Sequence, residues 1–79
     1  MSAEVLEEVR QTVAEVFGVD PGEVSAETSP ESLPAWDSIG HLNLILAAEQ
    51  RFGISFEPDK IPHLVSVRVL ADAILAQQG

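Results

Sequence analysis

The 79-residue sequence contains no cysteine, and this absence removes several classes of site at once. Without thiols there is no disulfide framework, no thiolate zinc site and no cysteine nucleophile. Basic residues are scarce as well, with four Lys and Arg against 13 Asp and Glu, for a formal net charge of −9. This balance argues strongly against nucleic acid or an anionic membrane surface as a partner.

Long apolar runs are also missing. No run is long enough to cross a bilayer, and the first residues lack the basic and apolar stretches of a signal peptide. We therefore expect a cytoplasmic protein without membrane insertion. The length predicts a single domain over residues 1–79, with a core too small to hide a deep active site. At 46% hydrophobic residues, the chain is too apolar to be read as disordered.

The negative charge is concentrated in the first half of the chain. Residues 1–37 hold nine acids and one base, whereas residues 38–79 hold four acids and three bases. One interpretation is that the acidic half provides solubility. The other is that it steers the chain toward basic patches on partner enzymes.

Apolar spacing predicts three longer helices, over residues 3–17, 39–52 and 67–75. Gly18 is expected to end the first helix and Gly53 the second, and Ser66 is the expected N-cap of the third. Pro58 at a first helical position allows only about one turn of helix at 58–61. Together these elements predict an all-α fold, a small four-helix bundle with a long first loop.

The same spacing predicts which residues form the core. We expect the larger aliphatic side chains of the three helices to face one another, namely Val9, Val13, Leu42, Leu46, Leu70 and Ile74. Truncation of Leu46 to alanine should then cost about 2–5 kcal/mol.

Ser38 stands where the long loop of residues 18–37 changes into a helix. Asp37 is placed to cap that helix, and Trp36 is most simply an anchor that pins the loop to the core. A hydroxyl at this point is exposed and lies beside the positive end of the helix dipole. It is therefore a favourable place to attach a phosphodiester.

The run Trp36-Asp37-Ser38-Ile39, followed by an amphipathic helix, closely resembles the attachment site of the acyl carrier proteins. The sequences at residues 17–21, 52–54 and 66–67 resemble other landmarks of that family, in the same order and spacing. Peptidyl carriers more often have Gly-Gly-His-Ser at the serine, so the acyl carrier branch fits better.

The resemblance implies a monomeric carrier without catalytic activity of its own. A phosphopantetheinyl transferase would join 4′-phosphopantetheine from coenzyme A to Ser38, with Trp36, Asp37 and Ile39 as the surrounding motif. The thiol of this arm would hold an acyl or aminoacyl group as a thioester. An acyl-loading enzyme or ligase would supply the cargo, and a partner such as a ketosynthase would receive it in fatty acid, polyketide or related biosynthesis.

The second predicted helix departs from the family pattern, because fatty acid carriers are usually acidic where this chain has Gly40 and Asn43. We expect a nearly neutral docking face that relies on shape and apolar contact, made of Gly40, Asn43, Leu44, Ala47 and Arg51. This favours a dedicated carrier of a specialised pathway over the housekeeping fatty acid carrier. Acidic residues at positions 40 and 43 should restore the family pattern, and the loss of a helical glycine should slightly raise stability.

Two other interpretations stay open. The chain could be an unmodified acidic helical adaptor, in which Ser38 only adds to the helix cap. Asp37, Ser38 and His41 lie within one turn and suggest a hydrolase triad, but no nucleophile elbow or oxyanion-hole sequence accompanies them. We therefore expect His41 to face solvent and His63 to lie in a loop, with no metal site.

Overall fold

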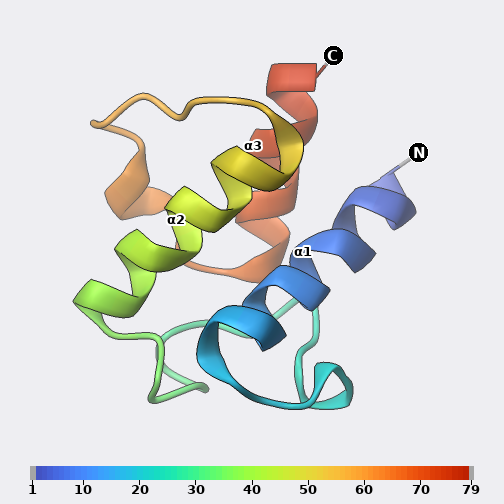
Figure 1. Cartoon of the computed structure of the whole chain (residues 1–79), viewed down its shortest axis with the longest axis vertical. Helices are drawn as coiled ribbons and strands as arrows, with labels where there is room; N and C mark the ends of the chain where they lie inside the picture. The colour runs from blue at the N-terminus through green and yellow to red at the C-terminus, as the bar shows by residue number, and fades with distance from the viewer. Residues whose placement is uncertain (1, 79) are drawn as a thin grey trace.

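Three α-helices and two short 3-10 helices make up the fold of the computed structural model, which describes residues 2–78. Their order along the chain is α1 (Ser2–Phe17), η1 (Pro21–Glu23), α2 (Ser38–Phe52), η2 (Ile61–His63) and α3 (Val67–Gln78). Helix α1 packs against both α2 and α3, as Figure 1 shows. The described residues form no strand, and the predicted all-α class is confirmed.

The predicted helix-ending signals act as expected. Gly18 and Gly53 both have φ of 67°, the left-handed conformation that ends α1 and α2 at low cost only for glycine. At the start of α3, the Ser66 hydroxyl oxygen accepts a hydrogen bond of 3.1 Å from the backbone N–H of Val69. The three long helices therefore begin and end within a few residues of the predicted bounds.

The short helix between α2 and α3 lies later than predicted. Residues 58–60 form turns, and η2 begins at Ile61 rather than at Pro58. Pro62, in the first turn of η2, needs no N–H partner there and fits this position as well as Pro58 would have fitted its own. Because the sequence has a proline at each position, it did not decide which of the two lies in the first turn of the short helix.

The core lies where α1 meets α2, α3 and the long loop. Val9, Val13, Leu70 and Ile74 are buried as predicted, with at most 1% of each exposed. The prediction for α2 is wrong. Its buried side chains are Leu44, Ile45 and Ala48, while Leu42 and Leu46 are each 56% exposed.

The long loop is held to the helices by backbone and side-chain bonds. Arg10, the one base among residues 1–37, donates from Nε to the Val24 carbonyl and from Nη2 to the Pro21 carbonyl, each at 2.6 Å. Farther along, the Thr28 carbonyl accepts from the first N–H of α3, that of Val67, at 3.0 Å. The last bond satisfies an N–H that the start of α3 would leave open, and together the three bonds hold the loop to α1 and α3.

Candidate functional site

Ser38 is the first residue of α2, and its side chain is exposed. The carboxylate of Asp37 accepts a hydrogen bond of 2.8 Å from the backbone N–H of Gly40, so Asp37 is the N-cap as predicted. Because Asp37 supplies the cap, the Ser38 hydroxyl is not needed for it. The hydroxyl is therefore free to react without loss of the cap.

The start of α2 packs closely against the end of α1 at Gly40. A Cβ atom built on Gly40 would lie 2.6 Å from Cε1 of Phe17 and 2.8 Å from the carbonyl oxygen of Ala35. Both separations are well below van der Waals contact, and one of them involves backbone. The expectation that an acidic residue at position 40 would raise stability is therefore wrong, because only glycine permits this approach.

Trp36 anchors the loop, with 2% of its surface exposed and its ring stacked on that of Phe17 at a centroid distance of 5.8 Å. The indole Nε1–H donates a hydrogen bond of 2.9 Å to Nδ1 of His41. Since an indole nitrogen can only donate, Nδ1 of His41 accepts and the ring proton sits on Nε2. Nε2–H in turn donates to the carbonyl oxygen of Ile61 at 2.8 Å.

His41 therefore does not face solvent, and the expectation from the sequence that it would is wrong. Its two ring nitrogens join the loop before α2 to η2, which lies 20 residues farther along the chain. With Nδ1 and Nε2 both engaged, neither is available as a base for the Ser38 hydroxyl. This geometry agrees with the absence of triad sequence signals.

A groove of about 490 Å³ opens beside Ser38. Its walls come from three segments, namely the long loop, the first turns of α2, and the chain around η2. Apart from Asp37, Ser38 and His41, the residues that line it are apolar: Pro30, Trp36, Leu42, Ile61, Pro62 and Val65. Leu42 had been assigned to the core, so sequence reasoning missed its part in this groove.

The predicted docking face on α2 requires correction. Leu44 is completely buried, and Gly40 and Ala47 are half-buried, so these three residues are not available as an open surface. Arg51 is turned toward α1, where Nε lies 3.2 Å from Oε1 of Glu8. Of the predicted face, Asn43 remains a clearly exposed position without such a contact to α1 in the described residues.

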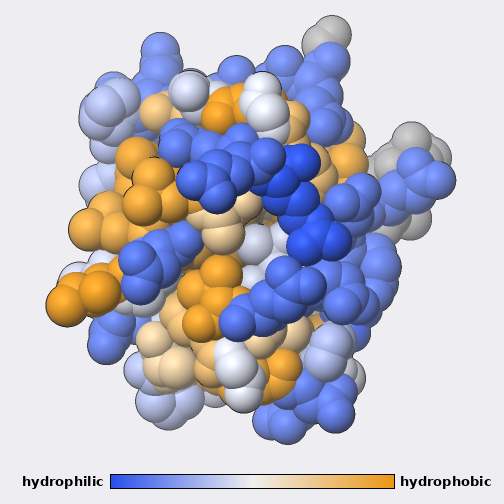
Figure 2. All heavy atoms as spheres, in the orientation of Figure 1, coloured by the Kyte–Doolittle hydropathy of each residue, from blue (hydrophilic) through white to orange (hydrophobic). Residues whose placement is uncertain are grey.

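The exposed apolar residues of α2 lie on a different face. Ile39 is 72% exposed and Leu42 and Leu46 are 56% exposed, at the spacing that places three side chains along one side of a helix. We call these three residues the α2 stripe. Figure 2 shows hydrophobic residues gathered on the α2 side of the molecule, whereas the α1 side is mainly hydrophilic.

The one carboxylate within α2 does not accompany this stripe. Glu49 Oε2 accepts a hydrogen bond of 2.8 Å from the backbone N–H of Phe56, so it secures the chain after α2. The α2 stripe itself therefore contains no charged side chain. The face predicted from the sequence was also nearly neutral, but it consists of other residues.

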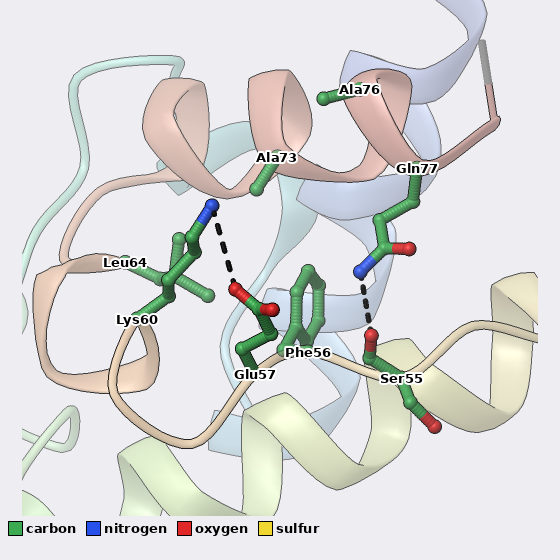
Figure 3. A pocket seen from close by; sticks show the side chains of 8 residues that line it. All are labelled: Ser55, Phe56, Glu57, Lys60, Leu64, Ala73, Ala76 and Gln77. Carbon is green, nitrogen blue, oxygen red and sulfur yellow. Dashed lines mark hydrogen bonds and ion pairs between the residues drawn. The ribbon is translucent and has the colours of Figure 1, made fainter.

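A second hollow, of about 420 Å³, lies between the α2–α3 connection and the last turns of α3 (Figure 3). Four of its lining residues pair with one another. Lys60 Nζ lies 3.7 Å from Glu57 Oε1 in an ion pair, and Gln77 Nε2 donates a hydrogen bond of 2.5 Å to the Ser55 carbonyl. None of its lining residues is shared with the groove beside Ser38.

Two other kinds of site are absent from residues 2–78. No group of three or more His, Asp or Glu side chains there is arranged to hold a metal ion. None of the helices in that range has both the length and the apolar character needed to cross a membrane.

Comparison with known proteins agrees with this geometry. The family model described as "Phosphopantetheine attachment site" matches residues 7–74. The acyl carrier protein of Thermosynechococcus vestitus is 37% identical over 73 residues, which cover 91% of this chain and 89% of that protein. The acyl carrier proteins of Tropheryma whipplei and Rubrobacter xylanophilus are 32% and 30% identical, each over 95% of this chain and 92% and 93% of their own lengths.

The fold and the matches define a phosphopantetheine-bearing carrier without catalytic activity of its own. This chain belongs to the acyl carrier protein family, and its partners include phosphopantetheinyl transferases and acyl-handling enzymes as a class.

Proposed function

We propose that Ser38 is the residue that carries 4′-phosphopantetheine, and that residues 1–79 act as one carrier domain. The observation that carries this proposal is the exposed Ser38 hydroxyl at the start of a 15-residue helix whose cap is supplied by its neighbour Asp37. A phosphodiester there would lie at the positive end of the α2 dipole, which favours negative charge. The residues present therefore fit the group.

The chemistry that follows is that of the arm, whose thiol holds an acyl or aminoacyl group as a thioester. A phosphopantetheinyl transferase adds the arm to Ser38 from coenzyme A. A loading enzyme or ligase then charges the thiol, and the carrier presents the charged arm to an acceptor such as a ketosynthase. In this proposal the carrier is monomeric and cytoplasmic.

We also propose that partner enzymes contact the α2 stripe of Ile39, Leu42 and Leu46 instead of the face proposed from the sequence. The stripe begins one residue after Ser38, so an enzyme that receives the arm must approach it. Since Glu49 and Arg51 of α2 are both engaged within the carrier, the stripe offers no charge to a basic docking patch. Partners with an apolar, uncharged patch suit it best, which favours a dedicated carrier of a specialised pathway.

The attachment site is tested by intact mass after treatment with a promiscuous phosphopantetheinyl transferase and coenzyme A. The wild type should gain one phosphopantetheinyl group, and Ser38→Ala should gain none. Ser32→Ala is the matched control, because Ser32 is an exposed serine of the same loop region and should leave the gain intact. A wild type that gains no mass would instead favour the unmodified adaptor.

Partner preference is tested by restoring carboxylates without disturbing the packing at Gly40. Asn43 and Gln50 are exposed on α2, so Asn43→Glu with Gln50→Glu adds charge at no steric cost. The double variant in its arm-bearing form should become a better substrate for a fatty acid ketosynthase with a basic docking patch, and high salt should remove the gain. Equal rates at low and high salt would place partner choice outside α2.

A further inference from the structure

The groove beside Ser38 is already formed in the protein alone, because hydrogen bonds hold its three walls in place. Trp36 in the loop donates to His41 in α2, and His41 donates to the Ile61 carbonyl of η2. A ligand that enters such a groove does not have to order it first, so little of its binding free energy is lost.

The lining of the groove suits an apolar group, and its volume leaves room for one. Its volume of about 490 Å³ lies toward the lower part of the range of ligand pockets, roughly 300–1,000 Å³. Its aliphatic lining residues are Pro30, Leu42, Ile61, Pro62 and Val65. Among residues 2–78, no Lys or Arg lines the groove, and the one carboxylate there that does, that of Asp37, caps α2. The groove therefore selects apolar rather than charged occupants.

We propose that this groove binds the proximal part of the prosthetic arm itself, the gem-dimethyl segment that follows the phosphate, in the arm-bearing carrier. This inference rests on the proposed attachment at Ser38. Because Ser38 is itself part of the groove wall, the attached arm begins at the groove. In 4′-phosphopantetheine the second carbon atom beyond the phosphate carries two methyl groups, which form an apolar branch of the kind that the groove lining accepts.

Covalent attachment makes even weak apolar contact effective. A tethered group sits near its site at a high effective concentration, so no association cost is incurred each time it docks. Docking of the proximal segment would leave the amide-rich remainder and the thiol outside the groove. The core residues Leu44, Leu70 and Ile74 are completely buried and are not part of the groove lining. The groove thus sets the direction in which the arm leaves the protein.

The test compares the protein with and without its arm by NMR, after intact mass has confirmed that the arm is present. The chain has one tryptophan, so the indole N–H of Trp36 is a single reporter inside the groove wall. Attachment of the arm should shift this resonance. Nuclear Overhauser cross-peaks should join the two methyl groups of the arm to protons of Trp36, Leu42 or Val65.

Val65 and Val69 form a matched pair for the control. They are 43% and 41% exposed, and only Val65 lines the groove. In Val65→Ser the cross-peaks should be lost and the shift of the Trp36 indole on attachment reduced, while Val69→Ser should behave as the wild type. Both variants should retain the attachment, because neither changes Ser38 or its helix.

The possible failures are distinguishable. A wild type that gains the arm but shows no cross-peaks to groove residues overturns this inference and leaves the proposed function standing. Cross-peaks to Leu44 or Ile74 instead overturn it in favour of an arm that enters the bundle. Equal losses in the two valine variants overturn it as well. A chain that gains no arm overturns both proposals.

Discussion

Truncation of Leu44 and of Leu46, two residues apart on α2, should have very different effects on stability. Leu44 is completely buried, whereas Leu46 keeps 56% of its surface in water. Removing a buried leucine side chain loses its transfer free energy and leaves a cavity, a cost of about 2–5 kcal/mol. Less than half of the Leu46 surface is buried, so its truncation loses little burial free energy and leaves no enclosed cavity. Leu46→Ala should therefore cost less than about 1 kcal/mol.

These costs are large relative to the stability of so short a chain. Net stabilities of about 5–15 kcal/mol are usual, and short domains lie near the low end. For a domain of this size each 1 kcal/mol corresponds to about 4–8 °C in Tm, so Leu44→Ala should lower Tm by more than about 8 °C. The sequence prediction had assigned the large cost to Leu46, and the structure reverses it.

Urea unfolding of the two variants measures the difference. Trp36 is a suitable fluorescence probe because it is the sole tryptophan and is 2% exposed. Midpoints should be compared at unchanged m, so that a shift reports stability and not a change in the unfolded state. Equal midpoints, or a larger loss in Leu46→Ala, would mean that α2 presents a different face to α1 and that the α2 stripe is wrong.

Three further perturbations test individual contacts. His41→Ala leaves the buried indole N–H of Trp36 without its acceptor and should cost about 1–3 kcal/mol; an unchanged indole N–H resonance would refute the contact. Gly40→Ala should lower the free energy of unfolding by about 1–3 kcal/mol through overpacking, measured in urea, despite alanine's better helix propensity; a gain in stability would contradict the close approach. Hydrogen bonds from Gln11 and then from Arg10 hold the pKa of Glu7 below its ordinary value, so this contribution to stability is present at neutral pH and is lost as the pH falls through that lowered pKa. Gln11→Ala should raise the Glu7 pKa in a carboxyl NMR titration, and no rise would exclude Gln11 as its cause.

The parts of the fold that local chemistry controls could be predicted from the sequence. Helix ends at Gly18 and Gly53 and the cap at Asp37 depend on a few neighbouring residues, and all three were predicted. The buried faces of α1 and α3 were also predicted, because their apolar residues repeat on one side. The Trp36 anchor was predicted because an isolated large apolar residue in a long loop suits a loop that is pinned to the core.

The face of α2 could not be read in this way, because large apolar residues lie on more than one side of it. Leu42, Leu44, Ile45 and Leu46 are nearly consecutive, and helical spacing alone gives several equivalent stripes. Only the position of α1 decides that Leu44 and Ile45 point inward.

Contacts between distant segments account for the other errors. The two bonds of His41 depend on the path of the loop and on η2, so no local pattern announces them. The need for glycine at position 40 arises from Phe17, at the end of a different helix. In both cases the sequence offered one signal, a residue of unusual type close to Ser38: the histidine at position 41 and the helical glycine at position 40. Tertiary contacts explain why each is there.

The location of the arm on Ser38 is tested most directly by fragmenting the modified protein. Trypsin cleaves after Lys and Arg, and no such residue lies between Arg10 and Arg51. Residues 11–51 should therefore be released as one peptide, which holds Ser25, Ser29, Ser32 and Ser38. Backbone fragmentation between Ser32 and Ser38 gives two kinds of ion. The N-terminal ions should be unmodified, and the C-terminal ions should carry the phosphopantetheinyl mass. Added mass on any fragment that ends before Asp37 would contradict the assignment of Ser38.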